Sequence, residues 1–522
     1  MQIINYKQIS LFFFIAFLII GLAVYKDYGI NWDDSASRYN GLTNWSFIFE
    51  NNQHLFTCSE RYHGPALETL LIGVEKLFAL EDSREIMLAH HLVDFLIFYL
   101  AAIAFFLSAK ILFGEYKWAL FATLALVLSP RIFAEAFYNS KDLGFLSAMI
   151  FSFYTLLRIK QHPSVIWWLL HGIATGFAID IRILGVVIFP VSLYFFFNEA
   201  IQRADVRKKY LVLGSLYPLL LFGCVIAFWP VLWNAPGFHL ERAFLEMKKY
   251  PWIGWVHYLN QYVPSANLPW HYLPVWISIT TPFPFIALGL AGGIWVLKDF
   301  ATGPINFIKH NALWGAIFFM AFGPLAVIIY MKPVVYDAWR HVYFIYPFFI
   351  LLAVYTLWHI SEKVKEQYKK TVTAACTLLF VFLTGVNIYM HPHQNVYFNL
   401  LSIQYFKPIE KQFETDYWGL SYKQGLEYLL RNNSGKAKIK VSAINDAGYA
   451  NRDILKKEDR DRFDFIESIS ESDFCVSNYR QWGKPFPPPY SPIYEIKRFD
   501  IPILTIYKIH HATDSNALNR FN

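Results

Sequence analysis

Two adjacent carboxylates, Asp33 and Asp34, follow the first long apolar stretch of the sequence. A carboxylate at a membrane surface is costly to desolvate, so a buried pair there calls for a function. Such a group can accept a proton from an attacking hydroxyl or bind a cation. The alternative is a structural role, because Asp is favoured where a helix begins. The dipeptide alone leaves both interpretations open.

Basic, aromatic and acidic residues recur in four later segments that border apolar stretches. Arginine and histidine at such places can hold a phosphate through several hydrogen bonds. Polar residues there can equally anchor a helix at the headgroup layer, which is a common role of Trp and Tyr. The candidates for binding a substrate or a phosphate are Tyr62, His63, Arg131, Lys141, Asp142, His271, Lys332 and Arg340.

Two further polar groups receive structural interpretations. Asp180 and Arg182 are expected to pair with each other at a helix turn. His90, His91 and Asp94 have a helical spacing that could bind a metal. Polar contacts between packed membrane helices are the favoured interpretation for them.

The elements that must position these residues are apolar segments that could cross a bilayer. Of the 522 residues, 56% are hydrophobic and 16% are charged, whereas soluble domains carry roughly 25% charged residues. A spanning helix needs roughly 20 mostly apolar residues. About eleven segments are predicted to span: 11–25, 86–109, 116–133, 143–158, 164–180, 182–198, 210–230, 273–297, 311–331, 341–359 and 371–390. The sequence thus predicts a mainly α, polytopic membrane helix bundle over residues 1–390.

The charges of the connections predict how the bundle is oriented. Every second connection is short and rich in Lys and Arg, as in 203–209 and 363–370, which is typical of cytoplasmic loops. The N-terminus is therefore expected in the cytoplasm, and an odd number of spans places the C-terminus outside the inner or plasma membrane. The alternate loops, including the long first loop over 26–85, hold all the candidate site residues.

Residues 391–522 differ in composition from the bundle. Charges become frequent, and runs typical of strands occur at 438–443, 473–477 and 501–509, with a helical pattern at 421–431. These features predict a small soluble α/β domain on the extracytoplasmic side.

Composition and motifs exclude several classes of protein. The net charge of +7 is spread among apolar segments, which favours membrane topology over nucleic-acid binding. Disorder is excluded, because a chain with 19% aromatic residues does not stay solvated. The short cytoplasmic loops leave little room for a nucleotide site, and the sequence has neither a P-loop nor a Gly-x-Gly-x-x-Gly motif after a strand.

The order of these features resembles the GT-C membrane glycosyltransferases, in particular the protein O-mannosyltransferases and lipid A aminoarabinose transferases. A first span is followed by an acidic pair and then by a long outer loop with an amphipathic helix, Ala66–Leu80, which lies flat in the interface or packs on the protein's own core. The resemblance covers about residues 10–350. It is carried by Trp32-Asp33-Asp34, the 129–142 loop, Trp270-His271-Tyr272 with Thr281-Pro282, and Arg340-His341.

The resemblance implies a hexosyl or pentosyl transferase that moves a sugar from a polyprenyl phosphate to an acceptor hydroxyl on the outer face. Asp33 matches the catalytic acidic residue of the family, and Asp142 matches a second acidic position. Asp34 stands where the family usually has Glu, which leaves open which carboxylate is the base. Glu60 stands where some members place a cation-binding glutamate, although its neighbours differ. A divalent cation is the one cofactor that the resemblance raises.

Two other classes of protein stay open. A multi-span transporter of a polar or lipid-linked solute would have a similar number of spans. Its binding groups would lie near the bilayer midplane, whereas the polar clusters here fall on one face. A structural scaffold would leave the acidic and basic loop residues without a role. The expected partners are the lipid-linked sugar, membrane lipids and an acceptor that is a lipid, a glycan or a protein, with no nucleic acid.

Overall fold

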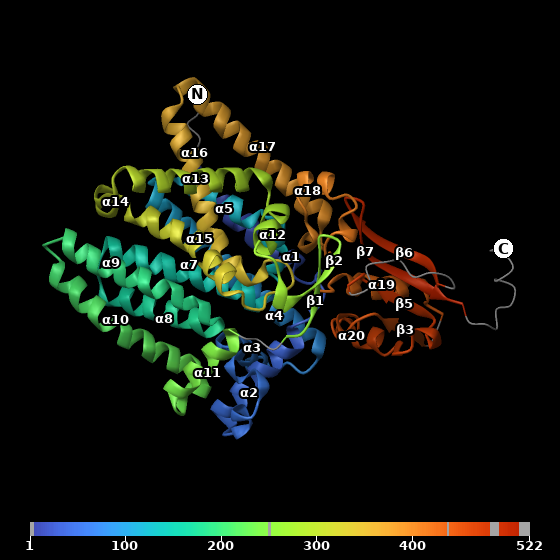
Figure 1. The fold of residues 1–522 in the computed structure, drawn as a ribbon. Coiled ribbons are helices and arrows are strands. Elements are labelled where there is room, and N and C mark those ends of the chain that lie inside the picture. The colour runs from blue at the N-terminus through green and yellow to red at the C-terminus, as the bar shows by residue number, and fades with distance from the viewer. Residues whose placement is uncertain (1–4, 249–251, 436–437, 481–489, 511–522) are drawn as a thin grey trace.

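The membrane part of the protein is a bundle of long apolar helices (Figure 1). The computed structural model describes residues 5–248, 252–435, 438–480 and 490–510. Within these residues, nine helical segments are long and apolar enough to cross a membrane, and two shorter apolar helices accompany them. The nine are α1 (Tyr6–Val24), α4 (Ser83–Phe113), α7 (Ser140–Gln161), α9 (Ile188–Gln202) with the turn before it, α10 (Arg207–Phe228), α13 (Phe283–Thr302), α15 (Ala312–Met331), α16 (Tyr346–Lys363) with the turn Arg340–Ile345, and α17 (Glu366–Met390).

The two shorter apolar helices are α5 (Tyr116–Val127) and α8 (Val165–Ile181). Together with the nine, they fall on the eleven segments predicted from the sequence. The mainly α, multi-pass membrane fold is therefore confirmed. One predicted segment, 273–297, is divided into α12 (Tyr272–Thr280) and α13. The break lies at Thr281-Pro282, because a residue before proline avoids the helical conformation and Thr281 is extended.

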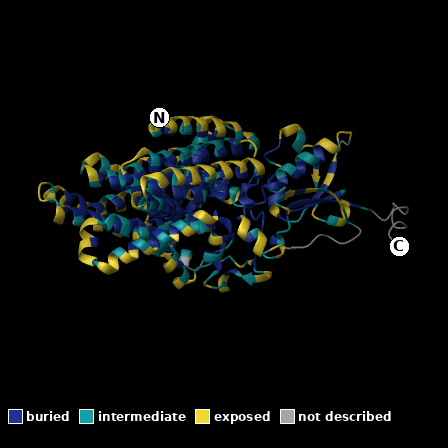
Figure 2. Ribbon diagram, turned by 90° about the horizontal axis from the view of Figure 1, so that it is seen from above, coloured by how far each residue is buried: buried dark blue, intermediate teal, exposed yellow. Residues whose placement is uncertain are grey.

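Two spans form the centre of the bundle. Buried residues make up 83% of the apolar window of α7 and 78% of that of the Arg340–Lys363 span, against 17% for α1. Figure 2 shows the exposed residues along the outer helices. Asp142 and Arg340 lie in the first turns of the two central spans, so close packing fixes the backbone that carries them.

The long first loop covers the end of the bundle that faces the C-terminal domain. It contains α2 (Asp34–Glu50) and α3 (Ala66–Leu77), which confirms the predicted amphipathic helix and places Leu67 in the core. Gly64 lies against the end of α8, where a Cβ would meet the carbonyl oxygen of Asp180 at 1.6 Å. Glycine permits this approach, which holds the loop against the bundle.

The remaining elements are short and lie between these spans or after them. They are α6 (Pro130–Glu135), α11 (Pro236–Lys248), β1 (Trp255–Tyr258), β2 (Gln261–Pro264), α14 (Pro304–His310), α18 (Leu400–Tyr405), α20 (Asp446–Ala450) and α21 (Lys457–Arg460).

A small sheet domain follows the last span and lies at one end of the bundle (red in Figure 1). Its five strands have the order β4-β3-β5-β7-β6, with β3 parallel to both neighbours and β7 antiparallel to both of its own. The predicted segments appear as α19 (Ser421–Asn432), β3 (Ile439–Ala443), β5 (Phe474–Ser477) and β7 (Ile501–Ile509). The sequence missed β4 (Phe463–Phe465), which has three residues, and β6 (Tyr490–Arg498), an edge strand with an internal proline.

Candidate active site

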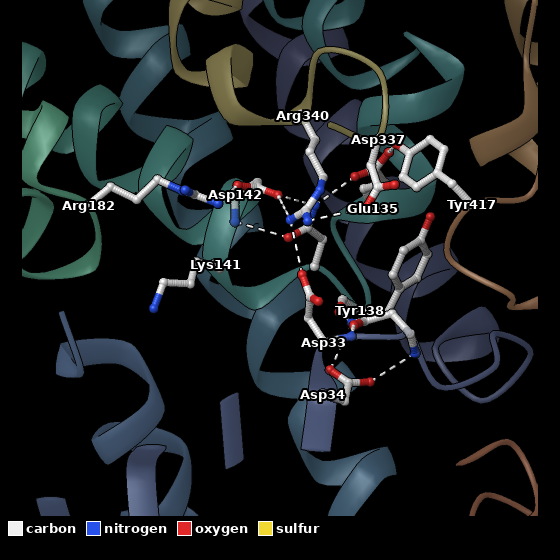
Figure 3. A network of polar contacts seen from close by, with 12 residues as sticks. Asp33, Asp34, Glu135, Tyr138, Lys141, Asp142, Arg182, Asp337, Arg340 and Tyr417 are labelled. Atoms are coloured by element: carbon white, nitrogen blue, oxygen red, sulfur yellow. Dashed lines mark hydrogen bonds and ion pairs between the residues drawn. The ribbon is translucent and has the colours of Figure 1, made fainter. Parts of the chain in front are cut away.

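Arg340 is the centre of a buried network of ion pairs (Figure 3). Its side chain is 2% exposed. Nη1 lies 3.1 Å from Oδ2 of Asp33 and 3.2 Å from Oδ2 of Asp142, and Nη2 lies 3.3 Å from Oδ2 of Asp337. The guanidinium carbon is also 4.7 Å from the centre of the Trp418 ring. A planar guanidinium with five donors suits such a junction, which a lysine could not reproduce.

Three separate segments of the chain bring these four charged groups together. Asp33 directly precedes α2, and Asp142 lies in the first turn of α7, where the Asn139 side chain accepts a hydrogen bond from its N–H at 2.9 Å. Asp337 lies in the loop before α16 with φ of +56°, a left-handed conformation that is uncommon for a residue with a side chain. Arg340 begins the helical turn after that loop.

Further arginines neutralise two of the three carboxylates. Arg182, which directly follows α8, pairs with Oδ1 of Asp142. Arg480, from the C-terminal domain, lies 2.8 Å from Oδ1 of Asp337. The expected pairing of Asp180 with Arg182 is therefore wrong, because the end of α8 turns Arg182 toward α7.

Asp33 differs from the other two carboxylates by its accessibility. Its side chain is 39% exposed, compared with 0% for Asp142 and 2% for Asp337. It is therefore the carboxylate of this network that a substrate can reach.

Asp34 has different surroundings from Asp33. Both of its oxygens accept hydrogen bonds from Asn31, at 3.0 Å from the backbone N–H and 2.7 Å from the side-chain amide. The same amide also donates to the carbonyl of Tyr138. Burial raises the pKa of Asp34 to about 8, so the group holds its proton through most of the neutral range. These contacts fit a residue that fixes the loop.

A cavity of about 130 Å³ opens beside Asp33 and Arg340. Six residues predicted from the sequence line it: Asp33, Glu60, Tyr62, His63, Lys141 and Arg340. The same cavity is also lined by Glu68, Arg182, Trp229, Tyr336 and His341. The first loop and the starts or ends of several spans thus converge on one pocket.

The polar groups at the rim of this pocket are themselves paired. Lys141 lies 2.6 Å from Oε1 of Glu68. Nδ1 of His63 lies 2.5 Å from Oε2 of Glu60, and this hydrogen bond lowers the pKa of Glu60. The Tyr62 hydroxyl lies 3.0 Å from Nδ1 of His239.

Two possible metal sites were considered from the sequence, one at His90, His91 and Asp94 and one at Glu60. In the described ranges, no group of three or more His, Cys, Asp or Glu side chains could hold a metal ion. Nε2 of His90 lies 2.9 Å from Oε1 of Glu75, and Nδ1 of His91 lies 3.2 Å from the carbonyl oxygen of Tyr25, which supports the helix-packing interpretation of these histidines. A cation at Glu60 stays a prediction from the resemblance.

Five predicted residues do not line the pocket: Asp34 and Asp142, described above, and His271, Lys332 and Arg131. His271 lies 2.6 Å from the Tyr258 hydroxyl, and Lys332 lines a separate cavity of about 30 Å³. Arg131 is buried within α6, where its Nε donates to the carbonyl of Tyr397 at 3.1 Å. Its guanidinium faces three aromatic rings, which stabilise a buried cation. The alternation of loops in the sequence predicts the membrane face on which a residue lies, but it does not predict how deeply the side chain is buried.

Sequence reasoning missed Asp337, Glu68 and Arg480 as site residues. Asp337 stands three positions before Arg340, a helical spacing that could have suggested the contact. Glu68 was hidden in the amphipathic pattern of α3. Arg480 comes from a separate domain, so no local pattern points to it.

Comparisons with known proteins agree with this architecture. Residues 66–229 match the family model described as dolichyl-phosphate-mannose-protein mannosyltransferase. The chain is also similar to the crystal structure of ArnT from Cupriavidus metallidurans in the apo state, with 13% identity, a TM-score of 0.51, and coverage of 96% of this chain and 98% of that one. The chain has the GT-C fold. The resemblance predicted from the sequence is thus confirmed.

A second structure, ArnT from the same organism bound to undecaprenyl phosphate, has 14% identity and a TM-score of 0.48, and covers 94% of this chain and 97% of that one. A search of curated proteins finds no match. The matched family segment includes Asp142 and Arg182 but neither Asp33 nor Arg340. The roles of Asp33 and Arg340 are therefore inferred from the geometry of this site.

Proposed function

We propose that the protein is a glycosyltransferase that moves a sugar from a polyprenyl-phosphate carrier to an acceptor hydroxyl at the extracytoplasmic face of the membrane. Asp33 is the general base and Arg340 the main cation for the donor phosphate. The observation that carries this proposal is the position of Asp33, an accessible carboxylate that shares a pocket wall with a buried arginine. The proposed donor carries a hexosyl or pentosyl group, and the proposed acceptor is a hydroxyl of a lipid, a glycan or a protein.

Two independent observations support a polyprenyl-phosphate carrier. The family model that matches residues 66–229 carries dolichyl-phosphate-mannose in its description. The pocket is lined partly by Ile181 and Trp229, at the ends of membrane helices, so a lipid-linked donor could approach from the bilayer. A lipid-linked sugar also removes the need for a nucleotide site.

The proposed reaction is a single displacement. The acceptor oxygen forms a bond to the anomeric carbon while the bond from that carbon to the phosphate oxygen breaks. The leaving electron pair stays on the polyprenyl phosphate, whose charge Arg340 and Lys141 stabilise. Asp33 takes the acceptor proton and later releases it to solvent. Attack opposite the leaving group inverts the anomeric centre.

The ion pair between Asp33 and Arg340 gives this sequence of events a physical basis. In the structure the two groups neutralise each other. A donor phosphate that binds Arg340 competes with Asp33 for the same guanidinium. The carboxylate is then free to accept a proton, so donor binding itself prepares the base.

The transporter alternative receives less support from the described residues. The polar cluster lies where spans begin and end, whereas a transporter site would be expected near the bilayer midplane. A buried polar group inside the bundle, His171, has its ring nitrogens bonded to Ser152, Thr155 and Ser192. These groups satisfy one another and leave no free ligand set there.

Purified protein supplied with labelled polyprenyl-phosphate sugars and envelope extract tests this function. The proposal predicts protein-dependent transfer of label and release of polyprenyl phosphate. Cells with and without the gene should also differ in the mass of one glycan or glycolipid. An unchanged glycan profile, together with no consumption of any lipid-linked donor, would contradict the proposal.

A further inference from the structure

One side chain of the C-terminal domain enters the ion-pair network of the membrane domain. Arg480 follows β5, and its side chain is 9% exposed. Nη2 lies 2.8 Å from Oδ1 of Asp337, and Nη1 donates to the carbonyl oxygen of Tyr417. Its guanidinium carbon lies 5.0 Å from the centre of the Trp32 ring. Trp32 directly precedes Asp33 in the chain.

We propose that Arg480 is a positioning residue of the transferase site, through which the C-terminal domain keeps Arg340 and Asp33 in their working arrangement. This inference rests on the proposed function and assigns the C-terminal domain a part in it. Arg480 does not line the pocket cavity, so it acts through Asp337 and Trp32.

Arg480 contributes to the charge balance around Arg340. Asp33, Asp142 and Asp337 all contact Arg340. Arg182 balances Asp142, and Arg480 balances Asp337. Arg340 therefore has one charge left, which either Asp33 or a donor phosphate can use. Without Arg480, Asp337 would bind Arg340 more strongly and oppose the approach of an anionic donor.

The C-terminal domain also holds the backbone just before Asp33. Arg480 packs on Trp32, and a second residue of the C-terminal domain, Asn451, holds Ile30 at both backbone groups. Its amide donates to the Ile30 carbonyl at 2.9 Å, and its oxygen accepts from the Ile30 N–H at 3.0 Å. The domain thus fixes the chain on the N-terminal side of Asp33. Small displacements of a catalytic group can reduce rates about 100-fold.

A pH readout follows from the same contacts. The titratable and charged groups that interact with Asp337 are Asp33, Tyr272, Arg340, Glu414, Tyr417 and Arg480. Arg480 lowers the pKa of the buried Asp337 carboxyl, so its loss raises that pKa and changes the charge of the network over the acidic range. The acidic limb of the kcat/KM profile should therefore move to higher pH.

The test compares Arg480→Gln with Arg480→Lys, Arg460→Gln and the double variant Arg480→Gln/Asp337→Asn. Arg460 is a matched control, because this arginine of the same domain pairs with Asp82 at the start of α4 and does not line the pocket. Each variant is purified, checked by thermal unfolding, and assayed for transfer and for binding of polyprenyl phosphate.

The expected result is a 10–100-fold lower kcat/KM for Arg480→Gln, with a higher donor KM and a shifted acidic limb. Arg480→Lys should keep the normal limb with an intermediate rate, because it retains the charge but not both contacts. Removing the charge of Asp337 should restore part of the donor affinity, and Arg460→Gln should resemble the wild type.

Several outcomes would overturn the inference. An Arg480→Gln variant with normal donor KM and pH profile would remove the positioning role. Equal losses in Arg480→Gln and Arg460→Gln, with no rescue by Asp337→Asn, would reduce the contact to domain docking. If wild-type protein neither binds the carrier nor transfers sugar, the proposed function fails and this role fails with it, whereas the first two outcomes leave the proposed function intact.

Discussion

Nη1 of Arg340 lies 3.1 Å from Oδ2 of Asp33, which joins the start of a central span to the loop after the first span. This contact pairs the proposed base with the proposed phosphate-binding cation. Each group is held in place by the other until a donor arrives. The arrangement implies that changes at the two residues should affect donor binding in opposite directions.

Replacing Arg340 should weaken donor binding as well as turnover, because the guanidinium would contact the phosphate in both ground and transition states. Arg340→Lys keeps one positive charge but cannot reach three carboxylates at once. We expect a higher donor KM, a lower kcat and a lower Tm. The measurement is steady-state transfer against donor concentration, with Arg460→Lys as the matched control. An unchanged donor KM would remove Arg340 from the phosphate site.

The raised pKa of Asp34 predicts that the stability of the folded protein depends on pH. Its pKa is about 8 in the folded protein and about 3.9 in an unfolded chain. Between these two pKa values the folded state holds a proton that the unfolded state releases. The stabilisation that results from this difference is therefore complete below about pH 4 and is lost as pH rises through 8. Asp34→Asn should show a smaller fall in Tm between pH 6 and 8 than the wild type. Parallel Tm curves would show that Asp34 is ionised when folded.

The membrane orientation gives a separate prediction. A reporter fused after Asn522 should be active only on the outer side of the membrane, because the basic connections alternate and the number of spans is odd. A fusion within 203–209 should give the opposite result and serves as the control. Cytoplasmic activity of the Asn522 fusion would place the pocket on the wrong face for an extracytoplasmic acceptor.

Glu60 allows a test of metal dependence. Its carboxylate is paired with His63 at the pocket rim, so a divalent cation would have to displace or share that partner. If the cation is required, chelation should abolish transfer, and Glu60→Gln should raise the metal concentration needed for half-maximal rate. Transfer that is insensitive to chelator would assign Glu60 to the orientation of His63.

The spans and the polar face could be predicted because each depends on local composition. Apolar runs separated by charges identify the helices. Thr281-Pro282 explains why the single apolar segment 273–297 forms two helices, α12 and α13. Asp33 and Arg340 could be placed on one face, because loops alternate across a membrane. Their contact could not be predicted, since the two residues belong to distant segments that packing brings together.

The errors have the same physical origin. Arg131 was expected at the pocket because its loop lies on the correct side, yet α6 directs it into an aromatic core. Arg182 was assigned to its near neighbour Asp180, whereas its partner is Asp142 in another helix. No sequence pattern identifies Arg480 as a site residue, because its contacts depend on how the C-terminal domain packs against the membrane domain.

The most direct test of the central claim is the rate of sugar transfer by Asp33→Asn. This change keeps the shape of the side chain and removes the proton acceptor, which should reduce kcat by about 10²–10⁴-fold. Folding should survive, since an amide is less costly to bury than a carboxylate. Binding of polyprenyl phosphate should be retained or tightened, because Arg340 loses a competing partner. Near-normal transfer by Asp33→Asn would contradict the assignment of Asp33 as the base, and near-normal transfer by Asp33→Asn, Asp34→Asn and the double variant would exclude both carboxylates of the pair.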